Sequence, residues 1–154
     1  MNSEVKLPKV LSGISGEYFV AAELSRLGYI ASITLRNSAG IDIMASNASA
    51  TKTAAIQVKT NQSNKKSWLL RDKAETFISE NHFYIFVNLA TEVGSPEYHI
   101  VPSEIVAEYI TVGHAKWLKT PGRKGQAHRD TSMRQFEDRD KIYLNKWELL
   151  GLGK

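Results

Sequence analysis

Three polar side chains interrupt two segments that otherwise have the composition of buried β-strands. Asp42 lies between two isoleucines, and the segment 53–60 carries Gln57 and Lys59 among aliphatic residues. Removing a charged group from water is costly unless the group is paired or binds a metal ion. An aspartate, an amide and a lysine in one short stretch therefore indicate either solvated edge strands or a reactive centre.

Strand geometry predicts that these three side chains meet. Alternate residues of a strand point to the same side, so Gln57 and Lys59 share one face. The polar segment 47–51 predicts a hairpin, and a turn near its middle would place Asp42 across from residue 56 or 57. Cross-strand neighbours have Cβ atoms about 5 Å apart. One carboxylate, one amide and one amine are thus expected on a common patch.

A fourth candidate, Glu17, comes from the segment 13–28, which has the periodicity of a helix that ends at Gly28. The apolar stripe of this helix consists of Val20, Ala21, Leu24 and Leu27, and Glu17 falls within the same arc. A carboxylate in a buried stripe requires a partner. It also lies in the first turn, where the helix dipole favours negative charge, so an N-terminal capping role is an equal alternative.

The chemistry of this set is that of a hard divalent cation. Mg²⁺ prefers oxygen ligands, often one or two carboxylates with waters and phosphates. Asp42, Glu17 and the amide oxygen of Gln57 could supply such ligands. Lys59 could orient and activate a water molecule or neutralise charge that develops on a phosphate. The group therefore suits hydrolysis of a phosphodiester.

The pattern Gly-Ile-Asp-Ile, a hairpin, and then Ile-Gln-Val-Lys resembles the PD-(D/E)XK nuclease superfamily. The sequence GEYFVAAELSRLGY is similar to the helix that opens archaeal Holliday-junction resolvases and Mrr-type restriction endonuclease domains. This resemblance implies a restriction endonuclease-like α/β fold, a three-layer α/β/α core with a central mixed β-sheet. It also implies Mg²⁺ (or Mn²⁺) dependence and DNA cleavage, with Glu17, Asp42 and Gln57 at the metal and Lys59 beside them as catalytic residues.

Gln57 stands where the superfamily more often has an acidic residue, although Mrr-like members share the variant. An amide is a weaker ligand and removes one negative charge. Two hypotheses follow: a Mg²⁺-dependent DNA endonuclease, and a catalytically silent module that keeps the nuclease fold and binds DNA or a protein partner. If the substrate is a Holliday junction, the enzyme is expected to be a symmetric homodimer.

The basic residues are concentrated in two segments. The net charge is +4, and residues 59–73 and 114–134 carry five and six basic residues against one acidic residue each. Such segments suit a polyanionic partner, or are simply solvated loops. The predicted nucleic-acid-binding residues are Lys65, Lys66, Arg123, Lys124, Arg129 and Arg134. The four histidines have no metal-ligand spacing, and Trp117 is predicted to anchor its segment to the core.

The length of 154 residues fits a single domain, with a core at about 13–111 and a basic C-terminal extension at about 112–154. Residues 112–140 are expected to be irregular. The chain has no cysteine, which excludes disulfides, thiolate zinc sites and cysteine nucleophiles. Without an apolar run long enough for a signal peptide or a membrane span, it is expected to be soluble and cytoplasmic, with no membrane partner. The expected elements are strands at 29–35, 41–46, 53–60, 82–90 and 97–101, and helices at 13–28, 71–80 and 103–110.

Overall fold

The computed structural model describes residues 6–35, 38–90 and 94–153. Its centre is a mixed five-stranded sheet in the order β1-β2-β3-β5-β6, in which only β3 and β5 run parallel. The strands of this sheet are β1 (Ile30–Ile33), β2 (Ile43–Ser46), β3 (Thr53–Asn61), β5 (His82–Asn88) and β6 (Glu97–Pro102). All five coincide closely with segments that the sequence predicted as strands.

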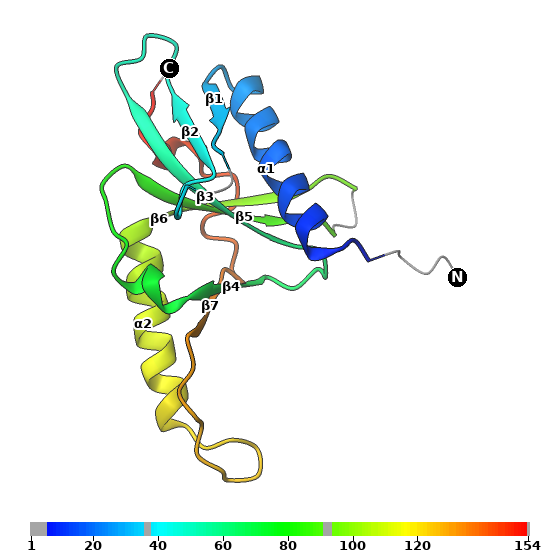
Figure 1. Cartoon of the computed structure of the whole chain (residues 1–154), viewed down its shortest axis with the longest axis vertical. Helices are drawn as coiled ribbons and strands as arrows, with labels where there is room; N and C mark the ends of the chain where they lie inside the picture. Colours follow the sequence, from blue (N-terminus) through cyan, green and yellow to red (C-terminus); the bar gives the residue numbers. More distant parts are fainter. Residues whose placement is uncertain (1–5, 36–37, 91–93, 154) are drawn as a thin grey trace.

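Helices cover both faces of the sheet (Figure 1). Helix α1 (Lys9–Arg26) packs on one face, while α2 (Ser103–Lys119) covers the other. A second sheet of two antiparallel strands, β4 (Ser67–Arg71) and β7 (Met133–Glu137), lies on the α2 side. The predicted three-layer α/β/α core with a mixed sheet is confirmed.

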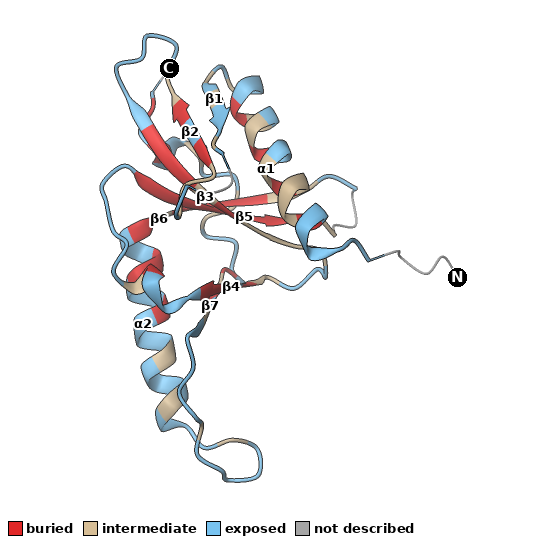
Figure 2. Cartoon of the chain, in the orientation of Figure 1, coloured by how far each residue is buried: buried red, intermediate tan, exposed pale blue. Residues whose placement is uncertain are grey.

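Strand β5 divides the hydrophobic core into two halves because its alternate side chains point to opposite faces. Phe83, Ile85 and Val87 belong to the cluster under α1, and Tyr84 and Phe86 belong to the cluster under α2. Every residue of β5 is buried, as expected for an interior strand covered on both sides (Figure 2).

Helix α1 ends as the sequence predicted. Gly28 adopts φ +92°, its N–H bonds the carbonyl of Ser25, and the N–H of Tyr29 bonds the carbonyl of Leu24. This pair of bonds is a Schellman motif, which requires a left-handed residue after the helix. The start was predicted too late: the helix begins at Lys9, directly after Pro8, whose carbonyl accepts the N–H of Ser12.

The helix predicted at 71–80 is wrong. Residues 67–71 form β4 with alternating burial, and only a 3₁₀ turn, η1 (Asp72–Glu75), follows. The period of two in Trp68 and Leu70, both buried, is the local signal of a strand, but its partner β7 is far away in the sequence.

Helix α2 starts at Ser103 as predicted but is longer than predicted. It continues to Lys119 although Thr111, Val112 and Gly113 are weak helix formers, and it stops before Pro121, with Thr120 extended. The expected irregular segment 112–140 is therefore helical at its start and a strand near its end. Pro102 precedes the helix, and the Ser103 hydroxyl accepts the backbone N–H of Ser79 and donates to the Ser79 carbonyl rather than capping the first turn.

We call residues 112–132 the arm, because this stretch projects from the rest of the molecule as the outer half of α2 and the loop that returns to β7 (Figure 1). After β7 the chain returns to the α1 side, where the 3₁₀ turn η2 (Trp147–Leu150) brings Leu150 and Leu152 into the core. These two leucines anchor the last described segment to the core. In the described parts of the chain, no helix has the length and apolar character needed to cross a membrane.

Candidate active site

Strand β3 presents Gln57 and Lys59 on one face, as alternation predicted. Ile56 and Val58 are buried toward α1, whereas Gln57 and Lys59 are half-buried on the opposite face. Their neighbours on the parallel strand β5 are Tyr84 and Phe86. The two polar side chains thus lie on the α2 side of the sheet, next to an aromatic floor.

The hairpin between β2 and β3 brings Asp42 to the same point. Ile43 pairs with Ile56, so the turn centre that the sequence predicted is confirmed. Just before this pair, the Asp42 N–H donates to the Ile56 carbonyl at 2.8 Å, and the Asp42 Oδ2 accepts the N–H of Val58 at 2.7 Å. The carboxylate is therefore held against the backbone between Gln57 and Lys59.

Helix α1 brings Glu17 toward Asp42 through a close approach to β3. Gly16 lies so near Thr60 that a Cβ at this position would stand 1.9 Å from the Thr60 Oγ1. Only glycine permits this contact. It places the half-buried Glu17 on the wall of a cavity of about 260 Å³ that Asp42 also lines. The two carboxylates of the predicted set therefore share a cavity.

Gln57 and Lys59 line a second hollow, of about 350 Å³, with Arg71, Lys73 and Phe77 on its walls. Burial lowers the pKa of Lys59, the nearby Asp42 carboxylate opposes that shift, and the positive charges of Lys73 and Arg71 add to it. The amine is thus close enough to Asp42 to interact with its charge. The structure thus divides the four predicted residues between two hollows: Glu17 and Asp42 line one, and Gln57 and Lys59 line the other.

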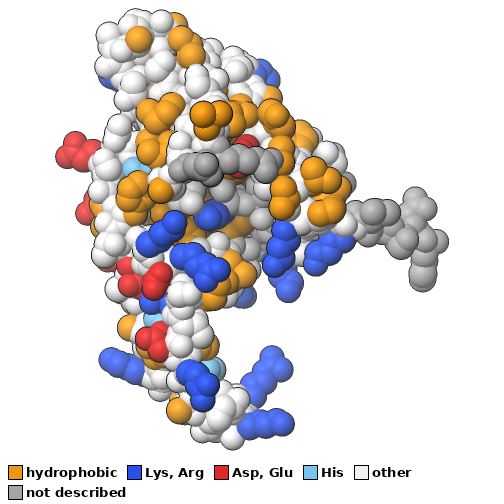
Figure 3. All heavy atoms as spheres, viewed as in Figure 1, with side chains coloured by type: hydrophobic (Ala, Val, Ile, Leu, Met, Phe, Trp, Pro, Cys, Tyr) orange, Lys and Arg blue, Asp and Glu red, His pale blue; other side chains and the backbone are white. Residues whose placement is uncertain are grey.

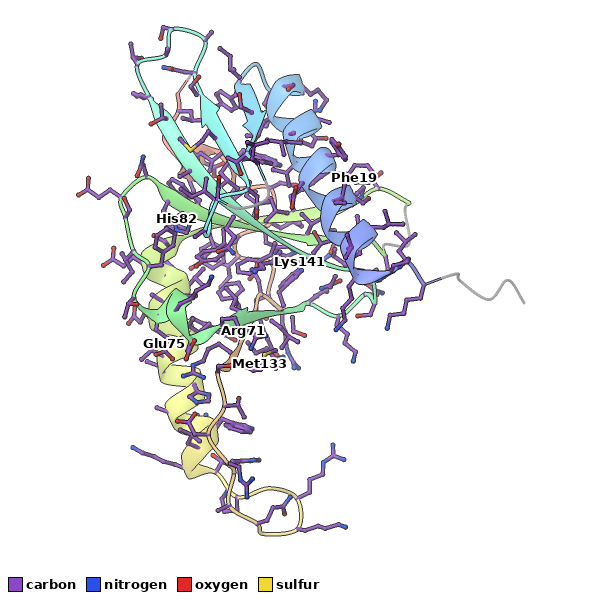
Figure 4. The ribbon with its side chains drawn as sticks, in the orientation of Figure 1. Phe19, Arg71, Glu75, His82, Met133 and Lys141 are labelled. Atoms are coloured by element: carbon purple, nitrogen blue, oxygen red, sulfur yellow. The ribbon has the colours of Figure 1, made fainter. Side chains whose placement is uncertain are left out.

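His82 supports the loop that precedes Asp42, a role that the sequence did not reveal. Its Nε2 donates to the carbonyl of Gly40 at 3.1 Å, and its ring packs edge-on against Phe77 and Tyr84. Burial lowers the pKa of His82, while the Gly40 carbonyl and the Asp42 charge partly offset this shift. The buried ring of His82 thus has a structural role, and Figure 4 labels this residue at the start of β5.

The predicted nucleic-acid-binding residues lie at two separate places. Lys65 and Lys66 lie in the connection between β3 and β4, and Arg123, Lys124 and Arg129 are exposed on the arm. Arg134 differs from the others, because its Nε bonds Glu75 and its Nη1 bonds the carbonyls of Thr131 and Met133. Its guanidinium is thus already engaged where β7 leaves the arm. The sequence did not single out Arg71 or Lys73, although both lie in its first basic segment.

Trp117 does not anchor the arm to the core, so that prediction is wrong. Its ring is 40% exposed and stacks between His128, at 4.0 Å between ring centroids, and His114, at 5.5 Å. The surrounding segment has no apolar core to reach, because the arm projects beyond the sheet. Phe136 of β7, at 1% exposure, is packed into the core instead.

The three predicted ligands are of the chemical type that a hard cation prefers, but they line two different hollows. Among the described residues no group of three histidine, cysteine, aspartate or glutamate side chains is placed to hold a metal. Two carboxylates, Asp42 and Glu17, with the Gln57 amide oxygen are nevertheless the number and kind of protein ligands that Mg²⁺ commonly uses with waters.

Comparison with known proteins gives a structural relationship only. No family model and no curated protein sequence matches the chain. The Holliday junction resolvase Hjc of Archaeoglobus fulgidus superimposes with a TM-score of 0.53 at 14% identity, over 92% of this chain and 98% of the resolvase. A bacterial homing endonuclease superimposes with a TM-score of 0.55 at 14% identity, over 94% and 92% of the two chains. The fold predicted from the sequence resemblance is thereby confirmed.

Proposed function

From the PD-(D/E)XK-type nuclease fold that this chain has, we propose that it is a Mg²⁺-dependent DNA endonuclease. The observation that carries the proposal is the hydrogen bond of the Asp42 carboxylate to the Val58 N–H, 2.7 Å long. It fixes an aspartate between Gln57 and Lys59, beside the cavity that Glu17 shares. The bond between Asp42 and Val58 supports the proposal that the two pairs, Glu17 with Asp42 and Gln57 with Lys59, act as one site.

The proposed ligands of Mg²⁺ or Mn²⁺ are Asp42, Glu17 and the amide oxygen of Gln57. The bond to Val58 engages Oδ2 of Asp42, which leaves Oδ1 for the ion. A bound ion would lower the pKa of a water molecule and stabilise negative charge at the phosphate. Holding one carboxylate oxygen against the backbone orients the other, so the protein supplies a preorganised position for that ion.

Lys59 is the proposed catalytic partner. Its lowered pKa increases the neutral fraction of the amine at a given pH, and the Asp42 charge partly opposes this shift. In this position the amine can hold the attacking water by a hydrogen bond and exchange a proton with it. The protonated form can instead neutralise charge on the phosphate.

DNA is the proposed partner of both basic regions. Lys65, Lys66, Arg123, Lys124 and Arg129 would contact backbone phosphates, which bind basic side chains without sequence readout. Arg134 would contribute mainly by ordering the base of the arm through its bond to Glu75. A four-way junction as substrate would require a homodimer, since two strands related by a two-fold axis must be cut.

A second candidate function rests on Gln57. With an amide in place of a third carboxylate, the site carries less negative charge to hold a cation. A silent module that binds DNA or a protein partner through the same surface would keep the fold without the reaction.

Cleavage of plasmid and branched DNA in Mg²⁺ or Mn²⁺ separates these two functions. The wild type is expected to cut, and Asp42→Asn and Lys59→Met are expected not to. Asn retains an oxygen that can accept the Val58 N–H, so folding should survive. Lys52→Met, at an exposed lysine of the hairpin, is the matched control and should cut normally. DNA binding without cutting in either metal would support the silent module instead.

A further inference from the structure

The hollow beside Gln57 has an unusual charge for a site expected to bind a cation. Lys59, Arg71 and Lys73 line it, and none of the described residues on its wall is acidic. Figure 3 shows Lys and Arg side chains gathered on this face between the sheet and the arm. The carboxylates of Glu17 and Asp42 line the other cavity instead. The two hollows therefore differ in electrostatic character.

The fold holds these cations in place. Arg71 ends β4, where its partner is Met133 of β7, and its Nη1 donates to the Ser132 hydroxyl at 3.0 Å (Figure 4). Lys73 follows in η1. The acidic residue between them, Asp72, caps the backbone N–H of Lys73 at 2.9 Å and does not line the hollow. Three cations thus line the hollow with no acidic side chain among the described residues of its wall, and a bound anion would reduce their mutual repulsion.

An aromatic ring borders the same hollow. Phe77 is 43% exposed, although one edge of its ring packs against His82 and it touches Gly40. Gly40 has φ +73° and no side chain to cover the ring. A half-exposed aromatic ring next to clustered cations is the combination with which proteins bind single nucleotides of a strand, by stacking on the base and pairing with the phosphate.

We propose that this hollow is a nucleotide-binding site for an unpaired part of a DNA strand, in which Arg71 and Lys73 bind a phosphate next to the scissile one and Phe77 stacks on its base. The proposal rests on the proposed nuclease function for its substrate. A base inside a duplex is already stacked on both sides, so the site selects branched, frayed or single-stranded DNA. The volume of about 350 Å³ is within the range of small-ligand pockets.

The protein supplies these charges itself, so binding at this site should not require a metal ion. The test is the fluorescence anisotropy of a labelled single strand, a splayed duplex and a blunt duplex, all in EDTA. The Arg71→Ala/Lys73→Ala variant should bind the single strand about tenfold more weakly than the wild type. The slope of log affinity against log salt should fall by about 0.7 for each phosphate that the variant no longer neutralises.

Two further variants make the test specific. Phe77→Ala should weaken binding of the single strand and of the splayed duplex but leave the blunt duplex unchanged. Lys52→Ala/Lys146→Ala removes two exposed lysines that lie outside both the hollow and the arm. This variant should change all three affinities little. Circular dichroism establishes that each variant is folded.

The proposal is overturned if Arg71→Ala/Lys73→Ala binds as the wild type does, or if Lys52→Ala/Lys146→Ala loses as much affinity. Phe77→Ala weakening the blunt duplex equally would also overturn it, since the base would then not be selected. The assay contains no metal, so a protein that never cuts DNA can still pass. That result would contradict the nuclease function while leaving the nucleotide site in place.

Discussion

The arm and the rest of the molecule, which we call the body, both carry basic residues, but these residues differ in how far they are buried. In the body, Lys59 is half-buried beside Asp42, whose carboxylate bonds a backbone N–H. On the arm, Arg123, Lys124 and Arg129 are exposed at the end of a projection (Figure 2). Burying charge has an energetic cost that a protein bears where one geometry is needed, while exposed cations keep the mobility that suits phosphate contacts of varying position.

The arm nevertheless has some internal order. The Trp117 ring stacks on His128, and His114 donates to Asp130 at 2.8 Å across the base of the loop. These contacts join the outer part of α2 to the loop that returns to β7. They stabilise the arm but leave the side chains of Arg123 and Lys124 exposed. Exposed cations suit contacts with a DNA backbone rather than catalysis.

The difference between the body and the arm predicts that Lys59→Met has the largest effect on cleavage. Cleavage should fall by about 10²- to 10⁴-fold, the usual contribution of a positioned proton-transfer group. The folded protein should become more stable at neutral pH, because the pKa of Lys59 is lowered by folding and its charged form therefore opposes folding.

The sign of this stability effect can be followed with pH. Below the folded-state pKa of Lys59, the loss of stability caused by burying the charged amine is fully present. It disappears as the pH rises from that pKa toward the pKa of Lys59 in the unfolded chain. The stability difference between Lys59→Met and the wild type, measured by urea unfolding, should therefore shrink in alkaline solution. A variant that is less stable than the wild type at pH 7 would contradict the account.

The next largest effect is expected for a substitution of Asp138, and it is a loss of stability rather than of activity. This buried carboxylate lies 2.6 Å from the Nδ1 of His99 and accepts the N–H groups of Ile142 and Tyr143. Asp138→Ala should cost about 3–5 kcal/mol in free energy of unfolding, as when one partner of a buried pair is removed. Urea denaturation measures it, with the exposed Asp140→Ala as control; an equal decrease in the two variants would refute the role of the pair.

A smaller effect is expected at the contact of α1 with β3. Gly16→Ala would force the helix away from Thr60, at a cost of about 1–3 kcal/mol for overpacking. Because Glu17 follows directly, cleavage should weaken as well. Thr60→Ala in the same chain should recover part of the stability and part of the activity, measured by thermal unfolding and by cleavage. No recovery would mean that the contact does not position Glu17.

The smallest effect is expected on the arm. Arg123→Ala/Lys124→Ala should leave the unfolding free energy and the maximal cleavage rate unchanged. Duplex affinity should fall by less than about tenfold, and the salt slope by about 0.9 for each phosphate that the variant no longer neutralises. A filter-binding titration at several salt concentrations would measure this. A large fall in the maximal rate would remove the distinction between arm and body.

The sequence was most informative where structure is local. The hairpin that joins Asp42 to Gln57 follows from alternation and one polar turn, and the end of α1 follows from Gly28. The role of Arg71 could not be predicted in this way. It depends on the pairing of β4 with β7, whose residues are distant in the sequence. The contact of Trp117 with the core was predicted wrongly for the same reason, because no neighbouring residue in the sequence shows that the arm projects from the core.

The central claim is that Asp42, Gln57 and Glu17 form a metal site, and Gln57→Glu tests it most directly. The measurement is the single-turnover cleavage rate as a function of Mg²⁺ concentration for this variant and the wild type. A third carboxylate should lower the half-saturating Mg²⁺ concentration by roughly tenfold, because it adds a charged ligand to the site. If the two half-saturating concentrations are equal, or if neither protein cuts DNA at any Mg²⁺ concentration, the claim is contradicted.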